Sequence, residues 1–169
     1  LVPVRFFTDV PSYVFRKMMH TAAFASAAAM IIKSGSWSAA AITFLLGAVL
    51  SYPVLGILEK TRWYDRLLVQ KGQGEVRRSL SLFYLMAAVL TAAVWGIFGQ
   101  RVLTAAAILI WGTGDAAAAL VGIRFGKHPV RFGPSAGKKT REGSAAMFVV
   151  SFICGALMLI FVQKTGAAR

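Results

Sequence analysis

The sequence has few charged residues and very few acidic ones. Charged side chains make up 15% of the 169 residues, only 6 residues are aspartate or glutamate, and 57% of the chain is hydrophobic. The mean hydropathy is +0.67. A soluble domain of this length needs far more charge to cover its surface. The composition therefore excludes an ordinary soluble globular domain and favours a membrane protein.

Cysteine is nearly absent as well. The single cysteine, Cys154, lies in an apolar run, so the chain forms no internal disulfide and the sulfur is expected to pack as a small hydrophobic group. The net charge of +13 would suggest nucleic acid in a soluble protein. Here the basic residues flank apolar runs, which explains the charge without a nucleic-acid partner.

Five apolar runs are long enough, or nearly so, to cross a membrane as helices of roughly 20 residues. They cover residues 18–32, 37–58, 80–98, 102–123 and 144–162. The predicted fold class is therefore all-α, a polytopic transmembrane helical bundle in one membrane domain. Long connections cover residues 59–79 and 124–143. The many alanines suit close helix packing in lipid and leave faces with which a homodimer could form.

The basic residues gather on one side of these five spans. Three precede the first span and six lie in each long connection. Four lie on the opposite side: Lys33, Arg101, Lys164 and Arg169. Since positive charge accumulates in cytoplasmic loops, the N-terminus and both long connections are predicted to be cytoplasmic, and the C-terminus external.

Asp115 is the most informative acidic residue, because it lies inside the fourth predicted span. A carboxylate in the hydrocarbon layer is costly unless it faces a cavity, a cation or a partner, and such residues are usually functional. Gly112 and Gly114 weaken the helix just before it, and a break there would aim the N–H groups of a half-helix at an anion. The alternative is a structural salt bridge from Asp115 to a basic residue of another helix.

The second long connection is rich in glycine and lysine, as phosphate-binding loops are. Glycine lets backbone N–H groups approach a phosphate, lysine neutralises its charge, and Thr140 offers a hydroxyl. Glu142 could hold Mg²⁺ or orient a lysine. The spacing is not that of a Walker loop, and any basic cytoplasmic loop also attracts anionic lipid headgroups. The candidate phosphate-binding residues here are Gly122, Gly126, Lys138, Lys139, Thr140 and Gly143.

The first long connection has a similar character. Glu59 ends the second span beside Lys60, where an interfacial pair is expected. Arg77 and Arg78 stand where the third span begins and could clamp phosphates, with Glu75 beside them; a simple positive anchor is the alternative. A similar group opens the first span, where interfacial packing is the alternative for the histidine: Arg16, Lys17 and His20.

Together these residues resemble the membrane family that contains dolichol kinase and phytol kinase and is related to phosphatidate cytidylyltransferase. The family's motif is Asp-x-x-Ala-x-x-x-Gly-x-x-x-Gly, followed by Lys-Thr-x-Glu-Gly. The matching residues run from Asp115 to Gly126 and then from Lys139 to Gly143. Arg16-Lys17-x-x-His20 and Glu75-x-Arg77-Arg78 also look like family elements, and the likeness covers about residues 13–150.

The resemblance implies a kinase that uses CTP and Mg²⁺ to phosphorylate a membrane lipid alcohol, such as a polyprenol, dolichol or phytol, at the cytoplasmic face. It implies catalytic roles for Asp115, Glu142 and Lys139, with Asp115 orienting or deprotonating the hydroxyl or binding metal. The candidate magnesium ligands are Asp115, Glu142 and Glu75. One alternative is a cytidylyltransferase-like CDP-lipid synthase, although nothing after Gly143 resembles the further motif of that branch. The other is a non-catalytic lipid-binding or transport protein.

Overall fold

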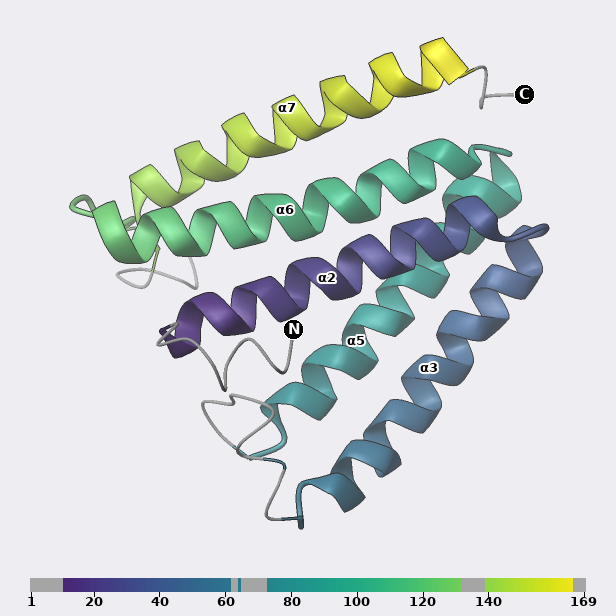
Figure 1. Ribbon diagram of the computed structural model, residues 1–169, viewed down its shortest axis with the longest axis horizontal. Coiled ribbons are helices and arrows are strands. Elements are labelled where there is room, and N and C mark those ends of the chain that lie inside the picture. The colour runs from purple at the N-terminus through teal and green to yellow at the C-terminus, as the bar shows by residue number, and fades with distance from the viewer. Residues whose placement is uncertain (1–10, 62–63, 65–72, 132–138, 166–169) are drawn as a thin grey trace. The chain divides into compact units, whose positions relative to one another are not determined.

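The described part of the chain consists of successive helices linked by loops. The computed structural model describes residues 11–61, 64, 73–131 and 139–165. The helices, in order, are α2 (Ser12–Lys33), α3 (Trp37–Leu58), α5 (Glu75–Leu90), η1 (Thr91–Ile97), α6 (Arg101–Phe125) and α7 (Arg141–Thr165), as Figure 1 shows. The described ranges hold no strand, only an isolated bridge between Pro129 and Thr140. The predicted all-α class is confirmed.

Among the described residues, four helices are long and apolar enough to cross a membrane. They are α3, α5 together with η1, α6, and residues Arg141–Phe161 of α7. The first predicted span lies within α2, a helix of 22 residues that includes Arg16, Lys17 and Lys33 and is not one of these four. The chain therefore has the helices of a multi-pass membrane protein, while their orientation stays a prediction.

Helices α2, α5 and α7 begin three or more residues earlier than their hydrophobicity predicts, α2 at Ser12 rather than residue 18. The predicted span 37–58 matches α3, whose start is marked by the Ser36 hydroxyl accepting a hydrogen bond from the Ala39 amide at 3.2 Å. In contrast, α5 begins at Glu75 rather than residue 80, and α7 at Arg141 rather than residue 144. The following residues assigned to the long connections therefore lie in helices: Glu75, Arg77, Arg78, Glu142 and Gly143.

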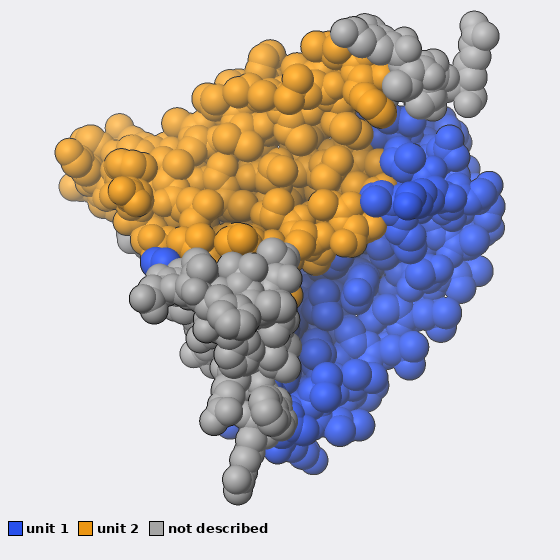
Figure 2. Space-filling view, viewed as in Figure 1, with its two compact units in different colours: residues 1–12, 29–104 blue, residues 13–28, 105–169 orange. Residues whose placement is uncertain are grey.

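The chain divides into two compact units (Figure 2). Unit 1 comprises residues 1–12 and 29–104, and unit 2 comprises residues 13–28 and 105–169. In unit 1, α3 packs against α5: Gly47 lies against the ring of Tyr84, and the Ser51 and Ser81 hydroxyls are 2.8 Å apart. A hydroxyl–hydroxyl bond between two apolar helices satisfies both groups where lipid offers no water.

The π-helix η1 continues α5 within unit 1. At its start, the buried Thr91 hydroxyl donates to the Ala87 carbonyl at 2.7 Å, which leaves no buried hydroxyl without a partner here. Near its end, Gly96 lies against the Trp37 ring of α3, where a Cβ would stand 3.0 Å from the nearest ring atom. Gly99, with a φ of 70°, then takes the left-handed conformation that ends the helix.

In unit 2, α6 and α7 run antiparallel and pack through small residues. Three facing pairs define the register, with one number rising as the other falls: Ile110–Gly155, Gly114–Ser151 and Gly122–Gly143. Small residues four apart on one helix face let two backbones approach closely in lipid, where packing rather than water exclusion drives association. Gly114 and Gly122 of α6 thus lie in the contact with α7.

Candidate functional site

Asp115 forms an ion pair with Lys17 inside unit 2. Lys17 Nζ donates to Asp115 Oδ2 at 2.5 Å, joining α2 to α6. The lysine side chain is 12% exposed and the aspartate side chain 49% exposed, so the carboxylate keeps an open side. The salt bridge that stood as the alternative for Asp115 therefore exists, and its partner is itself a predicted site residue. A cation at this distance offsets the cost of a carboxylate among apolar helices.

The helix is not broken before Asp115. Helix α6 continues from Arg101 to Phe125 without interruption. A Cβ on Gly112 would collide with Phe24 of α2, and a Cβ on Gly114 would collide with Ser151 of α7. Since residues two apart on an α-helix are turned by roughly 200°, the two glycines serve opposite faces. They let α2 and α7 approach α6, and no half-helix N-terminus points at Asp115.

The second half of the motif forms the corner between α6 and α7. Thr140 caps α7, because its Oγ1 accepts a hydrogen bond from the Gly143 amide at 3.2 Å. The same Oγ1 would lie 3.1 Å from a Cβ on Gly122, and the Thr140 side chain also fills the space beside Gly126. Gly143 packs on α6 so tightly that a Cβ would stand 2.7 Å from the Ala118 carbonyl oxygen. Three motif glycines and the threonine are therefore explained by packing.

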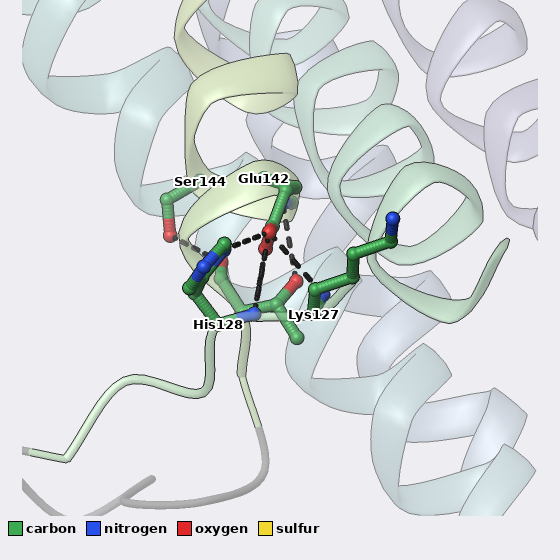
Figure 3. Close-up of polar contacts among 6 residues, drawn as sticks. Lys127, His128, Glu142 and Ser144 are labelled. Carbon is green, nitrogen blue, oxygen red and sulfur yellow. Dashed lines mark hydrogen bonds and ion pairs between the residues drawn. The ribbon is translucent and has the colours of Figure 1, made fainter. Parts of the chain in front are cut away.

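Glu142 ties the start of α7 to the residues that follow α6 (Figure 3). Its Oε1 accepts hydrogen bonds from the backbone amides of Lys127 and His128, both at 3.2 Å. It also lies 2.6 Å from His128 Nδ1. A carboxylate accepts only, so Nδ1 is the donor in this contact. Figure 3 shows the Lys127 side chain extending away from this cluster.

Backbone pairing closes the same corner. The Val130 amide donates to the Lys139 carbonyl at 2.8 Å, and the Arg141 amide donates to the His128 carbonyl at 2.9 Å. These bonds place the two chain segments beside each other on either side of the Pro129–Thr140 bridge. The basic residues on these segments are therefore held by an ordered backbone.

Five basic side chains are exposed around this corner: Arg124, Lys127, Arg131, Lys139 and Arg141. Within the described ranges none of them is ion-paired with a carboxylate, since Glu142 pairs with His128. Arg124 instead covers the ring of Phe125, with its guanidinium carbon 5.6 Å from the ring centroid. This end of unit 2 therefore carries a strong positive charge suited to a polyanion. Lys138, a predicted member of the group, lies outside the described residues.

Unit 1 holds Arg77 in a different setting. The guanidinium carbon of Arg77 lies 4.9 Å from the centroid of the Tyr52 ring, and its Nε is 3.7 Å from Glu59 Oε2. Glu59 Oε1 accepts a hydrogen bond from the Gly74 amide at 3.1 Å. Gly74, with a φ of 73°, precedes α5 and leaves the space that the guanidinium fills. Arg77 thus joins the end of α3 to the start of α5, whereas Arg78 is exposed.

The candidate magnesium ligands Asp115 and Glu142 lie far apart in unit 2. Asp115 is about 15 Å from Phe125 along α6, given a rise of about 1.5 Å per residue, and Glu142 binds the amides just beyond Phe125. One ion with ligands at about 2 Å does not reach both carboxylates. The described residues contain no group of three side chains that could hold a metal ion, and Glu75, in unit 1, stays a predicted ligand.

Two residues of this arrangement were not predicted. His128 carries no motif signal of its own, although it directly follows Gly126-Lys127 in the motif region. Glu59 was paired with Lys60, whereas the structure joins it to Gly74 and Arg77, a partnership that spans a long connection and that no local pattern reveals.

The remaining candidates lie on α2 of unit 2. Arg16 is partly buried and His20 is exposed. Arg16 precedes Lys17 directly and His20 follows it by one turn, on the helix that supplies the partner of Asp115.

Compared with family models, curated proteins and solved structures, the chain has no match in any of the three.

Proposed function

We propose that the protein is a lipid-alcohol kinase that transfers the terminal phosphoryl group of CTP to the hydroxyl of a membrane lipid such as a polyprenol, dolichol or phytol. One observation carries this proposal. The two halves of the motif lie in one unit, with an ion pair on α6 at one end and five exposed cations at the other.

The two ends are proposed to bind the two substrates, with the terminal phosphate extending from the cationic corner toward Asp115 so that the hydroxyl can reach it. The cationic corner lies between the end of α6 and the start of α7, where a water-soluble polyphosphate can arrive, and cationic side chains there offset its charge. The Asp115–Lys17 pair lies about 15 Å further along α6, among helices that a lipid can approach from the bilayer. The open side of the Asp115 carboxylate offers an acceptor for a hydroxyl proton.

The proposed reaction asks for positioning and charge stabilisation rather than covalent chemistry by the protein. The lipid oxygen attacks the terminal phosphorus, the bond from that phosphorus to the bridging oxygen breaks, and CDP leaves. The hydroxyl proton passes to the Asp115 carboxylate as the new ester bond forms. Lys139 and its neighbours are proposed to offset the charge of the phosphates, and Asp115 to orient the hydroxyl. CTP and the kinase class rest on the family resemblance of the motif.

The test uses purified protein in detergent with Mg²⁺, polyprenol, phytol and diacylglycerol. Label from γ-labelled CTP appearing in a lipid is the expected result and names the alcohol class. Label entering lipid only from α-labelled CTP would identify a cytidylyltransferase instead. If neither label enters lipid and CTP does not bind, the protein is a non-catalytic lipid-binding or transport protein. Asp115→Asn, checked for folding, is expected to remove the transfer.

A further inference from the structure

We infer that His128 contacts the phosphate of the bound polyanion and that Glu142 acts as a positioning residue by holding its ring. The inference rests on the proposed function for the nature of the ligand, a soluble polyphosphate. It gives Glu142 a role through His128 and the loop backbone, distinct from catalysis or metal binding.

Glu142 fixes the orientation of the His128 ring. His128 Nδ1 lies 2.6 Å from Glu142 Oε1, which occupies that nitrogen and sets the direction of the other one. The side chain of His128 is nevertheless 72% exposed, against 26% for Glu142. One edge of the ring is thus held by the protein, and the edge that carries Nε2 is left to a ligand.

The backbone beneath the ring is equally held. Glu142 accepts hydrogen bonds from the amide of His128 itself and from the preceding amide of Lys127. The His128 carbonyl accepts from the Arg141 amide at 2.9 Å, which places a basic residue directly beside the histidine. A side chain fixed at both its ring and its backbone loses little freedom when a ligand binds, which favours affinity.

The surrounding charge selects the class of ligand. A neutral ring held in this way accepts a hydrogen bond at Nε2, whereas a charged ring donates one, so the edge alone suits a hydroxyl or an oxyanion. The exposed cations on the two paired segments around His128 are Lys127, Arg131, Lys139 and Arg141. They favour an anion, and their number suits the several oxyanions of a polyphosphate.

The experiment measures binding of labelled CTP and of labelled tripolyphosphate to the full chain in detergent by equilibrium dialysis. His128→Gln is expected to weaken both ligands about tenfold to a hundredfold, as the loss of a hydrogen bond to a charged group does. Glu142→Gln is expected to weaken them similarly. The double variant is expected to bind no worse than the weaker single variant, because both changes remove the same contact. Lys33→Gln, which removes a charge at the end of α2 in unit 1, is the control and is expected to bind as the wild type.

A second measurement separates positioning from general destabilisation. The amides of Lys127 and His128 are expected to exchange with deuterium slowly in the wild type and faster in Glu142→Gln, with no change in His128→Gln, because the histidine side chain does not hold them. Wild-type binding by His128→Gln would overturn the inference and leave the kinase proposal intact.

The two ligands distinguish the failures. Tripolyphosphate binding that depends on His128, without label transfer from CTP, would support the contact and remove the proposed function. If phosphatidic acid in mixed micelles displaced labelled CTP but tripolyphosphate did not, the phosphate that His128 contacts would be that of a lipid headgroup. This result would overturn the inference.

Discussion

Gly143 of α7 faces Gly122 of α6 so closely that a Cβ on Gly143 would stand 3.3 Å from the Gly122 Cα. The same Cβ would stand 2.7 Å from the carbonyl oxygen of Ala118, a backbone atom that does not move aside. Both glycines belong to the motif that suggests a kinase. Their effect in the structure is to bring two membrane helices together at the corner that carries the positive charge.

Gly143→Ala is therefore expected to lower the free energy of unfolding by about 1–3 kcal/mol, the usual cost of overpacking a tight contact. Denaturant or thermal unfolding in detergent micelles measures it. Gly35→Ala is the matched control, because a Cβ there meets nothing within 4 Å. Equal stability of the two variants would contradict the close packing of α6 and α7.

The Lys17–Asp115 pair predicts a non-additive effect on stability. Lys17→Met leaves the Asp115 carboxylate without the cation 2.5 Å away, whereas Lys17→Met with Asp115→Asn leaves no charge to compensate. We expect the single variant to be less stable than the double variant by roughly 1–2 kcal/mol, within the range of coupled pairs. Unfolding of all four combinations in detergent gives the coupling. Additive effects would mean that the two side chains do not interact.

The adjacent arginines Arg77 and Arg78 are expected to behave differently. Arg77→Lys loses the planar group that covers Tyr52 and approaches Glu59, so we expect a loss of about 1 kcal/mol in stability. Arg78→Lys changes an exposed side chain, and its stability is expected to stay within about 0.5 kcal/mol of the wild type. Thermal unfolding compares the two. If Arg77→Lys instead weakened CTP binding at unchanged stability, Arg77 would be a phosphate ligand, as its sequence suggested.

The distribution of basic residues predicts the orientation in the membrane. In a Cys154→Ser background, Arg131→Cys is expected to react with a membrane-impermeant maleimide only when the cytoplasmic side is opened. Lys33→Cys is expected to react from the outside. Both side chains are exposed, so failure to react reports the membrane rather than burial by the protein. The reverse labelling pattern would place the cationic corner outside the cell.

The sequence predicts the helices better than their ends. Hydrophobicity identifies the apolar part of α5 and α7, but their first turns are polar and are set by Gly74 and Thr140, whose roles depend on contacts with distant residues. The second predicted span succeeds because Ser36, its cap, directly precedes the apolar run.

The glycines around Asp115 show why the site is harder to predict than the fold. Gly112 and Gly114 look the same in the sequence whether they break a helix or let a neighbouring helix approach closely. Only Phe24 and Ser151, which are far away in the sequence, decide in favour of packing. For the same reason the sequence marks Lys17 and Asp115 separately as site residues, and only the structure shows the ion pair between them.

The π-helix η1 contains more residues per turn than the α-helix α5 that it continues. A π-turn holds one residue more than an α-turn. Removal of one residue between Thr91 and Ile97 would let this segment close as an ordinary α-helix, with the helix before it and the Gly99 turn after it keeping their registers. The same removal in the middle of α3 would rotate every later contact by about 100°. Natural length variants of this chain are therefore expected to differ in η1 before they differ in α3.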